Sequence, residues 1–575
     1  MPNIFYTEYW NYTEKREYAM FDSRSKDIMP VRTWLTKPDA YIGLLMSSFV
    51  INMLGLVFPV CVLQFYDRVI PHKSGSTLAA MVCLILVALA LETVFKIMRS
   101  YVSSWSSERF TYNMGRKLFH RLLYSDLSEF EKNTAGLYLD KFNSAESLRE
   151  YYCGQNLTML VDLPFVSVYL ILIFVINKYM ITMPLFVIII MFIHSYLFES
   201  QTFVKLENKI NLIETKSKFL IEMISGIHTI KALGMEEQFM RRYERLHRQE
   251  IQSNYELIQR LSQNSRSGNL FSQLAVILTV SFGGVMVIHR ELSVGGLAAS
   301  ILLVGKIMQP VASLITYLQK KQNIEIAKKN YDFIMSFQPE YREDANTMTN
   351  FKGEINLRNV SFKYPGADRY VFNKLNLQVD ANQTVIIHGD GFSGKSTLLL
   401  LLCSLYKPTE GDFFVDGINI KDVDLEHLRR KMSLMPDSGE LFDGTIMDNL
   451  TLFEADKYSS EAIEISKQIG LHNIIENMPS SYNTVVGTGT VDMLSKGHKQ
   501  QILIVRALVG NPRVILFDEA NIALDIDSDV KLRKYFGTIK GTCTMILVTH
   551  RPSLLEMADK HYRLENGSLV EFKWQ

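Results

Sequence analysis

Long apolar runs, separated by polar connections of very different lengths, dominate the first half of the chain. A helix rises about 1.5 Å per residue, so about 20 apolar residues cross the roughly 30 Å hydrocarbon core of a bilayer. Burying several helices that are apolar on every side inside a soluble domain is the less favoured alternative. The pattern predicts about six membrane-spanning helices, at residues 41–65, 78–98, 157–176, 181–198, 270–288 and 294–318.

The connections between these predicted spans differ in length and in charge. Those at 99–156 and 199–269 are long and contain many Lys and Arg residues, whereas the others are short and carry few. Positive charge concentrates on the cytoplasmic side of membrane proteins. We therefore expect both long connections and both chain ends to be cytoplasmic.

Five ionisable residues lie inside the predicted spans. Glu92 and Lys96 are four residues apart on one helix face, so we expect them to pair. Asp162, His194 and Lys306 are candidates to face a central path, because ionisable groups at membrane depth are costly and often functional. Snorkelling to the interface and pairing within the bundle are the alternatives. The pattern leaves open which of them line a path.

The pattern changes near residue 351, where short β-type runs begin to alternate with helical segments. This is typical of an α/β domain with a largely parallel sheet. We therefore divide the chain into a cytoplasmic N-terminal segment (1–37), a six-helix transmembrane domain with long cytoplasmic loops (38–335), a linker (336–350) and a nucleotide-binding domain (351–575).

A glycine-rich loop follows the predicted strand at 384–388 and precedes an apolar helix. It reads G-x-x-x-x-G-K-S, and in this strand, loop and helix context the backbone amides bind phosphate. Lys395 would reach the outer phosphates, and the Ser396 hydroxyl would bind magnesium. The loop therefore predicts a bound nucleotide with Mg²⁺, held by Gly389, Asp390, Gly391, Phe392, Ser393, Gly394, Lys395, Ser396 and Thr397.

Acidic and imidazole side chains follow two further apolar strands. Asp518 and Glu519 come directly after 514–517, and His550 follows 544–548. A carboxylate at the end of such a strand can hold Mg²⁺, and the next carboxylate can orient or deprotonate attacking water. An imidazole at the end of a neighbouring strand can contact a terminal phosphate. We therefore assign catalysis to Glu519 and His550 and the metal to Ser396 and Asp518.

Composition agrees with a membrane protein and excludes one function class. The 575 residues are 47% hydrophobic, with a formal net charge of +1 and a mean hydropathy of +0.05. A nucleic-acid binder needs a strongly basic face, so nucleic acid is not expected as a partner.

The order of the motifs is similar to the cassette of ATP-binding-cassette exporters. It runs from Tyr364 through GDGFSGKST (389–397), LMPDSGELFDGTIMDNL (434–450), LSKGH (494–498), VILFDEA (514–520) and IALD (522–525) to VTH (548–550). The stretches LQFYDRVIP (63–71) and 157–164 resemble the type I protein-secretion subfamily, the haemolysin and protease exporters. With the membrane half included, the resemblance covers nearly the whole chain.

This resemblance implies a fold, a location and partners. The fold would be a polytopic α-helical membrane domain fused to an α/β phosphate-loop domain. The protein would lie in a bacterial inner membrane as an ATP-driven exporter of unfolded polypeptide, such as an RTX-type toxin, a protease or an adhesin. A periplasmic membrane-fusion adaptor and an outer-membrane channel would be its partners. The few residues before the first span imply that the peptidase-like domain of some relatives is absent.

The resemblance also implies residue roles. Tyr364 would stack on adenine, Asp518 would serve magnesium and Glu519 would polarise water. Ser495 and Gly497 would cap the γ-phosphate bound to the opposite subunit, because such cassettes close head to tail around two nucleotides. Coupling segments to the cassette would lie near 139–148 and 225–235.

Four positions depart from the pattern of that family: Phe392, Asp437, Lys496 and His498. Glycine is usual at the first, the magnesium-sensing glutamine at the second, and the LSGGQ signature has glycine and glutamine at the last two. Because the signature acts in trans, these changes favour a heterodimer with one impaired site over a homodimer. A small-molecule or lipid exporter and an ATP-binding regulatory subunit remain alternatives.

Overall fold

The computed structural model describes residues 38–144, 147–149, 155–340, 346, 348, 350–487 and 494–572. The N-terminal segment predicted over 1–37 lies outside these residues. The described chain divides into two compact units. The first contains the residues up to Leu122 and 133–336, and the second contains Leu123–Lys132 and the residues from Phe337 onward.

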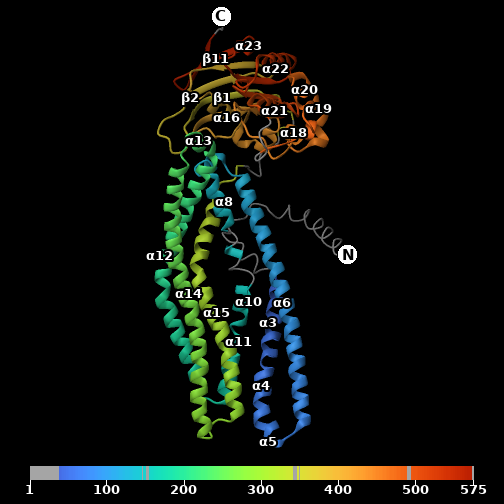
Figure 1. The fold of residues 1–575 in the computed structure, drawn as a ribbon. Helices are drawn as coiled ribbons and strands as arrows, with labels where there is room; N and C mark the ends of the chain where they lie inside the picture. The colour runs from blue at the N-terminus through green and yellow to red at the C-terminus, as the bar shows by residue number, and fades with distance from the viewer. Residues whose placement is uncertain are drawn as a thin grey trace. The chain divides into compact units, whose positions relative to one another are not determined.

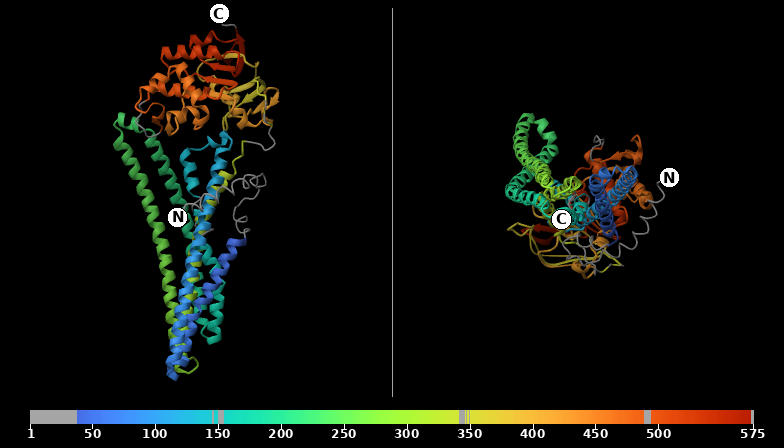
Figure 2. Two further views of the ribbon diagram at one scale, coloured as in Figure 1. Left: turned by 90° about the vertical axis from the view of Figure 1, so that its right-hand side faces the viewer. Right: turned by 90° about the horizontal axis from the view of Figure 1, so that it is seen from below.

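The first unit is helical throughout its described elements. The helices α12 and α14 run side by side and are joined at one end by the short α13 (Figure 1), and Figure 2 shows the same pair from further directions. The elements are α3 (Pro38–Gly55), α4 (Val57–Gln64), the π-helix η2 (Phe65–Val69), α5 (Ile70–His72), α6 (Gly75–Leu123), α8 (Ala135–Asn143), α10 (Gln155–Asp162), α11 (Phe165–Ile176), α12 (Thr182–Ser225), α13 (Ile227–Ala232), α14 (Glu236–Ile288) and α15 (Val294–Met335).

Helices occupy the predicted spans. Among the described residues, five are long and apolar enough to cross a membrane, and Thr182–Leu197 is a shorter apolar helix at the position of the fourth predicted span. This fourth segment is the apolar start of α12, which continues as a polar helix to Ser225. The five long segments are Ile42–His72, Gly75–Leu123, Thr158–Ile176, Arg266–Ile288 and Val294–Leu318.

The interior of the first unit lies between α11, α12, α14 and α15. Its most buried side chains, which have no exposed surface, include Ile173, Met180, Val187, Leu303 and Ile307. The apolar window of α15 is 44% buried, whereas that of α6 is 6% buried. The packing of α15 among several helices makes it the inner helix of this unit, while few residues in the apolar window of α6 are buried.

A polar contact joins η2 to the start of α15. The Asp67 carboxylate accepts hydrogen bonds from the Ser293 hydroxyl at 2.7 Å and from the Gly295 amide at 3.1 Å. Gly295 must be glycine for this contact, because a Cβ there would lie 2.6 Å from the Leu63 carbonyl oxygen. Asp67 therefore satisfies amide groups at the helix N-terminus, where a carboxylate is favourable.

The second unit is built on two larger sheets, which confirms the α/β class predicted for this half. The six-stranded sheet has the order β12-β11-β3-β10-β9-β6, and all its described strands except β12 pair in parallel. The four-stranded sheet has the order β2-β1-β4-β5 and is antiparallel. The strands are β1 (Ile355–Phe362), β2 (Phe372–Val379), β3 (Thr384–His388), β4 (Glu410–Val415), β5 (Ile418–Asn419), β6 (Met432–Met435), β9 (Val514–Asp518), β10 (Thr544–Val548), β11 (Lys560–Glu565) and β12 (Ser568–Phe572), with β7 (Gly444–Thr445) paired to β8 (Val485–Val486).

The helices of this unit connect the strands. Because β3, β10, β9 and β6 are parallel neighbours, the loops that follow them lie at the same edge of the sheet. That edge is where α/β sheets bind ligands. The helices are α16 (Lys395–Leu402), α17 (Leu425–Arg429), α18 (Ile446–Thr451), α19 (Ala455–Ile469), α20 (His472–Glu476), α21 (Lys496–Leu508), α22 (Ile526–Ile539) and α23 (Pro552–Leu555).

The segment between α6 and α8 belongs to the second unit. It contains the short helix α7 (Leu127–Phe130), which begins after Asp126 because the Asp126 carboxylate accepts from the Ser128 amide at 3.0 Å. Lys407 binds Asp126 at 2.7 Å, and the Tyr406 hydroxyl donates to the Glu131 carboxylate. The part of this connection that packs into the nucleotide unit is thus 123–132. The segment at 139–148, expected to couple to the cassette, belongs to the first unit, and its coupling role stays a prediction.

Candidate nucleotide site

The glycine-rich loop connects β3 to α16 and is closely packed at both ends. Gly394 has φ +101°, and a Cβ there would lie 2.7 Å from Cγ1 of Val371. A Cβ on Gly389 would lie 2.7 Å from the Ser393 hydroxyl oxygen and 3.0 Å from the Leu564 carbonyl oxygen. Only glycine fits both positions, so the loop keeps its backbone amides close to the start of α16.

Two polar groups of the loop have the placement that a phosphate ligand requires. The Lys395 ammonium donates to the carbonyl oxygens of Gly389 and Asp390, both at 2.9 Å, so its side chain spans the loop. The Ser393 hydroxyl is buried without a hydrogen-bond partner. Such a group costs about 1–3 kcal/mol, which a phosphate oxygen bound in the loop would offset.

Phe392 keeps the backbone conformation of the glycine that is usual at its position. Its φ is +63°, and its side chain is fully exposed beside the exposed Asp390 and Gly391. The left-handed conformation costs a residue with a Cβ about 1–2 kcal/mol. The Cβ of Phe392 therefore strains the backbone, and the exposed ring lies outside the loop.

Acidic side chains gather at the ends of β9 and β6. Burial raises the pKa of Asp518, and the nearby carboxylates of Asp437 and Glu519 raise it further. A hydrogen bond with Ser396 and the charge of Lys395 oppose this shift. The structure thus brings together the two predicted metal ligands, Ser396 and Asp518, with Asp437 as a neighbour.

This donor set fits magnesium, which takes oxygen ligands and usually one or two carboxylates together with phosphate and water. Ser396 and Asp518 would hold the ion, and its charge would neutralise charge that develops on phosphate oxygens. Within the described ranges, no group of three or more His, Cys, Asp and Glu side chains could hold a metal by itself. A site that the nucleotide completes agrees with that observation.

The two predicted catalytic residues contact each other. His550 Nε2 lies 3.2 Å from Oε1 of Glu519, although the two residues come from the ends of different strands. Glu519 has φ +48°, and its amide donates to the Val548 carbonyl at 2.9 Å. A strained non-glycine residue held by the neighbouring strand is typical of a functional site. The structure therefore presents a carboxylate and an imidazole together beside Asp518.

Asp437 is exposed and lies two residues after β6, next to Asp518 across the sheet edge, since Met435 pairs with Phe517. The loop that carries it is held from α21, because Gln500 Nε2 donates to the Pro436 carbonyl at 2.9 Å. Gln500 is 4% exposed. Sequence reasoning missed Gln500. The signal available in the sequence was an amide side chain on a predicted helix that continues with largely apolar residues.

Two neighbouring positions of the altered signature LSKGH differ in their surroundings: Gly497 is sterically constrained, and Lys496 is exposed. Ser495 caps α21, accepting from the His498 amide at 3.2 Å. A Cβ on Gly497 would lie 2.9 Å from the Ala523 carbonyl oxygen, so this glycine cannot be replaced without a backbone shift. Lys496 is exposed at the first position of the helix. The close contact explains why one glycine of the pair is present while the other is a lysine.

Tyr364 lies beside the helix that follows the phosphate loop. Its hydroxyl is 2.8 Å from the hydroxyl of Thr397 in α16. Its ring meets the rings of Phe362 and Tyr406 edge to face. The residue is partly buried, and its stacking on adenine stays a prediction.

A buried polar network behind the catalytic pair was also missed from sequence. Asn521 donates to Asp529 at 2.7 Å, and the Ser553 hydroxyl donates to the other Asp529 oxygen at 2.8 Å. Arg551 donates to the carbonyls of Ile522 and Leu524. These bonds fix the segments that directly follow Glu519 and His550, and those of Ser553 and Arg551 join residues more than 20 positions apart in sequence.

A pair of stacked histidines, His388 and His561, lies at the end of β3, next to the start of the phosphate loop. His388 ends β3, and its Nε2 lies 3.1 Å from Nδ1 of His561, with the two rings stacked. Burial, followed by the charges of His561, His550 and Arg563, lowers the pKa of His388 to about 4. The imidazole before the phosphate loop is therefore neutral near pH 7.

Comparison with known proteins covers both units. Residues 41–311 match the family described as ABC transporter transmembrane region, and residues 372–521 match the family described as ABC transporter. The alpha-hemolysin translocation ATP-binding protein HlyB of Escherichia coli O157:H7 is 28% identical, over 92% of this chain and 74% of its own length. The leukotoxin export ATP-binding protein LtxB of Aggregatibacter actinomycetemcomitans is 28% identical, over 92% of this chain and 75% of its own length.

A solved structure shows the same fold. It is the structure of a bacterial Atm1-family ABC exporter with ATP bound, with a TM-score of 0.79 and 20% sequence identity over 93% of this chain and 95% of that one. The chain is therefore an ATP-binding-cassette exporter, an ATPase coupled to transport, in which a helical transmembrane domain is fused to a nucleotide-binding domain, and it is homologous to the haemolysin-type exporters.

Proposed function

We propose that this chain is a subunit of a type I secretion system and moves unfolded polypeptide, such as an RTX-type toxin, a protease or an adhesin, out of the cytoplasm. The similarity to hemolysin translocation and leukotoxin export proteins over 92% of the chain carries this proposal. It extends through the membrane unit, where the cargo must pass, and is not confined to the cassette. The likeness to the Atm1-family exporter supports the fold and gives no information on cargo.

The two parts of the chain divide the work. Residues 38–335 form the passage through a bacterial inner membrane, residues 336–350 form the linker, and the cassette at 351–575 faces cytoplasmic ATP. The Lys and Arg residues of the long connections at 99–156 and 199–269 support this orientation. The segment 123–132, which packs into the nucleotide unit, is positioned to transmit its movements to α6 and α8.

Hydrolysis follows from the groups at the sheet edge. Loop amides, Lys395 and the Ser393 hydroxyl bind the phosphates, and Tyr364 stacks on adenine. Glu519 orients the attacking water and accepts its proton, while His550 holds the Glu519 carboxylate on one side and contacts the terminal phosphate. Closing the site excludes water and strengthens each of these charge interactions.

A second cassette subunit completes each site. Ser495 and Gly497 act on the nucleotide held by the partner, and we favour a heterodimer because Lys496 and His498 alter what this chain offers in trans. A periplasmic membrane-fusion adaptor and an outer-membrane channel continue the export path beyond the membrane. The exposure of Lys496 at the start of α21 supports the heterodimer, because this cation stands where the phosphate of the partner's nucleotide would approach the altered signature.

An ATP-binding regulatory subunit of a heterodimeric exporter is a second candidate. The strained Phe392 in the phosphate loop and the third carboxylate, Asp437, beside Asp518 favour it, because both alter the surroundings of the phosphates and magnesium on which hydrolysis depends. Against it, the Glu519 and His550 contact has a use in hydrolysis and none in a scaffold.

Steady-state ATPase activity of the full chain in lipid nanodiscs, compared with Glu519→Gln, separates these functions. Activity that Glu519→Gln abolishes is expected for an exporter subunit with a working site of its own. Nucleotide binding without turnover, also after a partner cassette protein is added, would refute the exporter role and leave the regulatory subunit. Reconstituted export of a labelled unfolded chain then tests the polypeptide cargo.

A further inference from the structure

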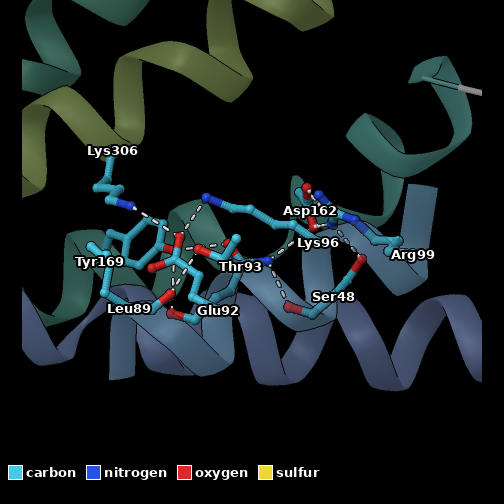
Figure 3. A network of polar contacts seen from close by, with 10 residues as sticks. Ser48, Leu89, Glu92, Thr93, Lys96, Arg99, Asp162, Tyr169 and Lys306 are labelled. Atoms are coloured by element: carbon cyan, nitrogen blue, oxygen red, sulfur yellow. Dashed lines mark hydrogen bonds and ion pairs between the residues drawn. The ribbon is translucent and has the colours of Figure 1, made fainter. Parts of the chain in front are cut away.

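A cluster of charged side chains lies within the membrane unit, apart from the nucleotide site (Figure 3). It joins five helices, α3, α6, α10, α11 and α15. Its ionisable members are Glu92, Lys96 and Arg99 of α6, Asp162 of α10 and Lys306 of α15. Three cations thus meet two carboxylates.

In one half of the cluster, which we call the saturated half, the carboxylate of Asp162 accepts three hydrogen bonds. Arg99 Nη1 donates to both oxygens of Asp162 at 2.9 Å and to the Ser48 hydroxyl at 3.0 Å. Asn52 donates to Asp162 at 2.9 Å, and the Tyr169 hydroxyl donates to the Asn52 side chain at 2.8 Å. The side chains of Arg99 and Asp162 are 16% and 20% exposed. This half fastens α6 to α3 and α10, and its carboxylate, Asp162, is engaged by Arg99 and Asn52.

The other half is not saturated. Lys96 Nζ lies 2.6 Å from Glu92 Oε1, and Lys306 Nζ lies 3.9 Å from the same oxygen. In Figure 3 the Lys306 side chain extends from α15 toward Glu92. The side chains of Lys96 and Lys306 are 53% and 41% exposed, whereas that of Glu92 is 15% exposed. Two ammonium groups therefore share one carboxylate oxygen, and each has room for another acceptor.

Position in the spans decides what these ammonium groups face. Lys306 lies in the middle of the span Val294–Leu318, and Lys96 lies near the end of the predicted span 78–98. An exposed cation in hydrocarbon costs about 3 kcal/mol or more, so such groups face other helices or a water-filled path. Lys306 also passes close to Gly55, where a Cβ would lie 3.5 Å from Nζ and 3.8 Å from the Tyr169 hydroxyl. Gly55 leaves room for the lysine beside the inner helix α15.

We propose that Lys306, with Lys96 beside it, binds carboxylate groups of the exported polypeptide, and that Glu92 occupies this site when no cargo is present. This inference rests on the proposed export of polypeptide. An acidic side chain of the cargo replaces Glu92 as the partner of the two lysines and leaves again as Glu92 returns. Lysine suits such exchange because its ammonium is a mobile point charge without the fixed geometry of arginine. The Arg99 and Asp162 pair holds α6 in place throughout.

The test uses the full chain in nanodiscs of neutral phosphatidylcholine. A fluorescent unstructured peptide of glutamate, glycine and serine is titrated by anisotropy, and a matched peptide with glutamine in place of glutamate is the reference. Lys306→Gln should weaken binding of the acidic peptide about tenfold, since one charged contact is lost. Glu92→Gln should strengthen it, because the internal competitor is removed.

Matched controls separate binding from structure. Asp162→Asn makes the same carboxylate-to-amide change in the saturated half, and it should lower Tm without strengthening peptide binding. Lys178→Gln removes an equal charge between α11 and α12, outside the cluster, and should leave binding unchanged. A cluster that serves structure alone predicts instead that Glu92→Gln and Lys306→Gln both lower Tm and change peptide binding in the same direction.

Two further outcomes would overturn the proposal. Equal binding of the glutamate and glutamine peptides would exclude a carboxylate site. Lys306-dependent effects that appear only with phosphatidylglycerol, as a shift in Tm, would assign the site to a lipid headgroup. ATPase activity sensitive to Glu519→Gln, measured on the same preparation, reports separately on the proposed exporter function.

Discussion

The close contact at Gly497 makes a strong prediction about the altered signature. In Gly497→Ala the new Cβ would lie 2.9 Å from the Ala523 carbonyl oxygen. That atom belongs to the backbone and cannot rotate away, so either the start of α21 or the segment after Glu519 must move. Overpacking of this kind costs about 1–3 kcal/mol.

The functional consequence follows from where the strain is absorbed. The segment containing Ala523 is tied to Glu519, whose carbonyl accepts a hydrogen bond from the Ile522 amide at 3.0 Å, and to Arg551, which donates to the carbonyls of Ile522 and Leu524. A shift there displaces the catalytic carboxylate. If about 1.4 kcal/mol of the strain raises the activation barrier, kcat falls about tenfold. We therefore expect Gly497→Ala to lower kcat about tenfold and to lower Tm.

Steady-state ATPase activity and thermal unfolding in nanodiscs check this expectation. Gly537→Ala is a matched control, because a Cβ at this exposed position of α22 meets nothing within 4 Å. It should gain up to about 1 kcal/mol of helix stability and leave hydrolysis unchanged. Wild-type kcat and Tm in Gly497→Ala would refute the reasoning that steric contact requires this glycine.

Three further predictions concern sites away from the signature. The pKa of His388 is lowered from 6.5 to about 4 in the folded protein, so between these pH values the unfolded chain binds a proton that the folded chain does not. Tm should therefore fall as pH is lowered through that window, and it should fall less in His388→Phe. Parallel plots of Tm against pH for the two proteins would contradict the lowered pKa of His388. Gly295→Ala places a Cβ 2.6 Å from the Leu63 carbonyl oxygen and should lower stability by about 1–3 kcal/mol in thermal unfolding, with a smaller loss for Asp67→Asn. Gln500→Met leaves the Pro436 carbonyl without its donor, at a cost of about 1–3 kcal/mol. Because Pro436 precedes Asp437, this change should raise the Mg²⁺ concentration for half-maximal ATPase activity. An unchanged magnesium dependence would show that Gln500 does not position Asp437.

Features that are local in sequence were predictable. An apolar run long enough to span a bilayer specifies a helix by itself, because every backbone group bonds within the segment. The strand, loop and helix around Lys395 are contiguous, so the phosphate loop could be located from its own residues. The fourth span is the partial exception, since its apolar run is shorter and merges into the long polar part of α12.

Features that depend on pairing between distant segments were not predictable. The sequence indicated that Glu92 and Lys96 pair, because four residues make one helical turn. It contained no sign that Lys306, on another helix, approaches the same carboxylate oxygen. It also contained no sign that 123–132 belongs to the second unit, where Asp126 caps α7.

The sequence by itself determined that the chain spans a membrane and binds nucleotide, since both properties follow from short-range patterns. Only the tertiary structure decided how its departures act. Strand order brings Asp437 beside Asp518, and helix packing places Gly497 against the Ala523 carbonyl while leaving Lys496 exposed. These distances depend on where remote segments meet, because steric contact acts over a few ångströms and charge over about 8 Å in physiological salt.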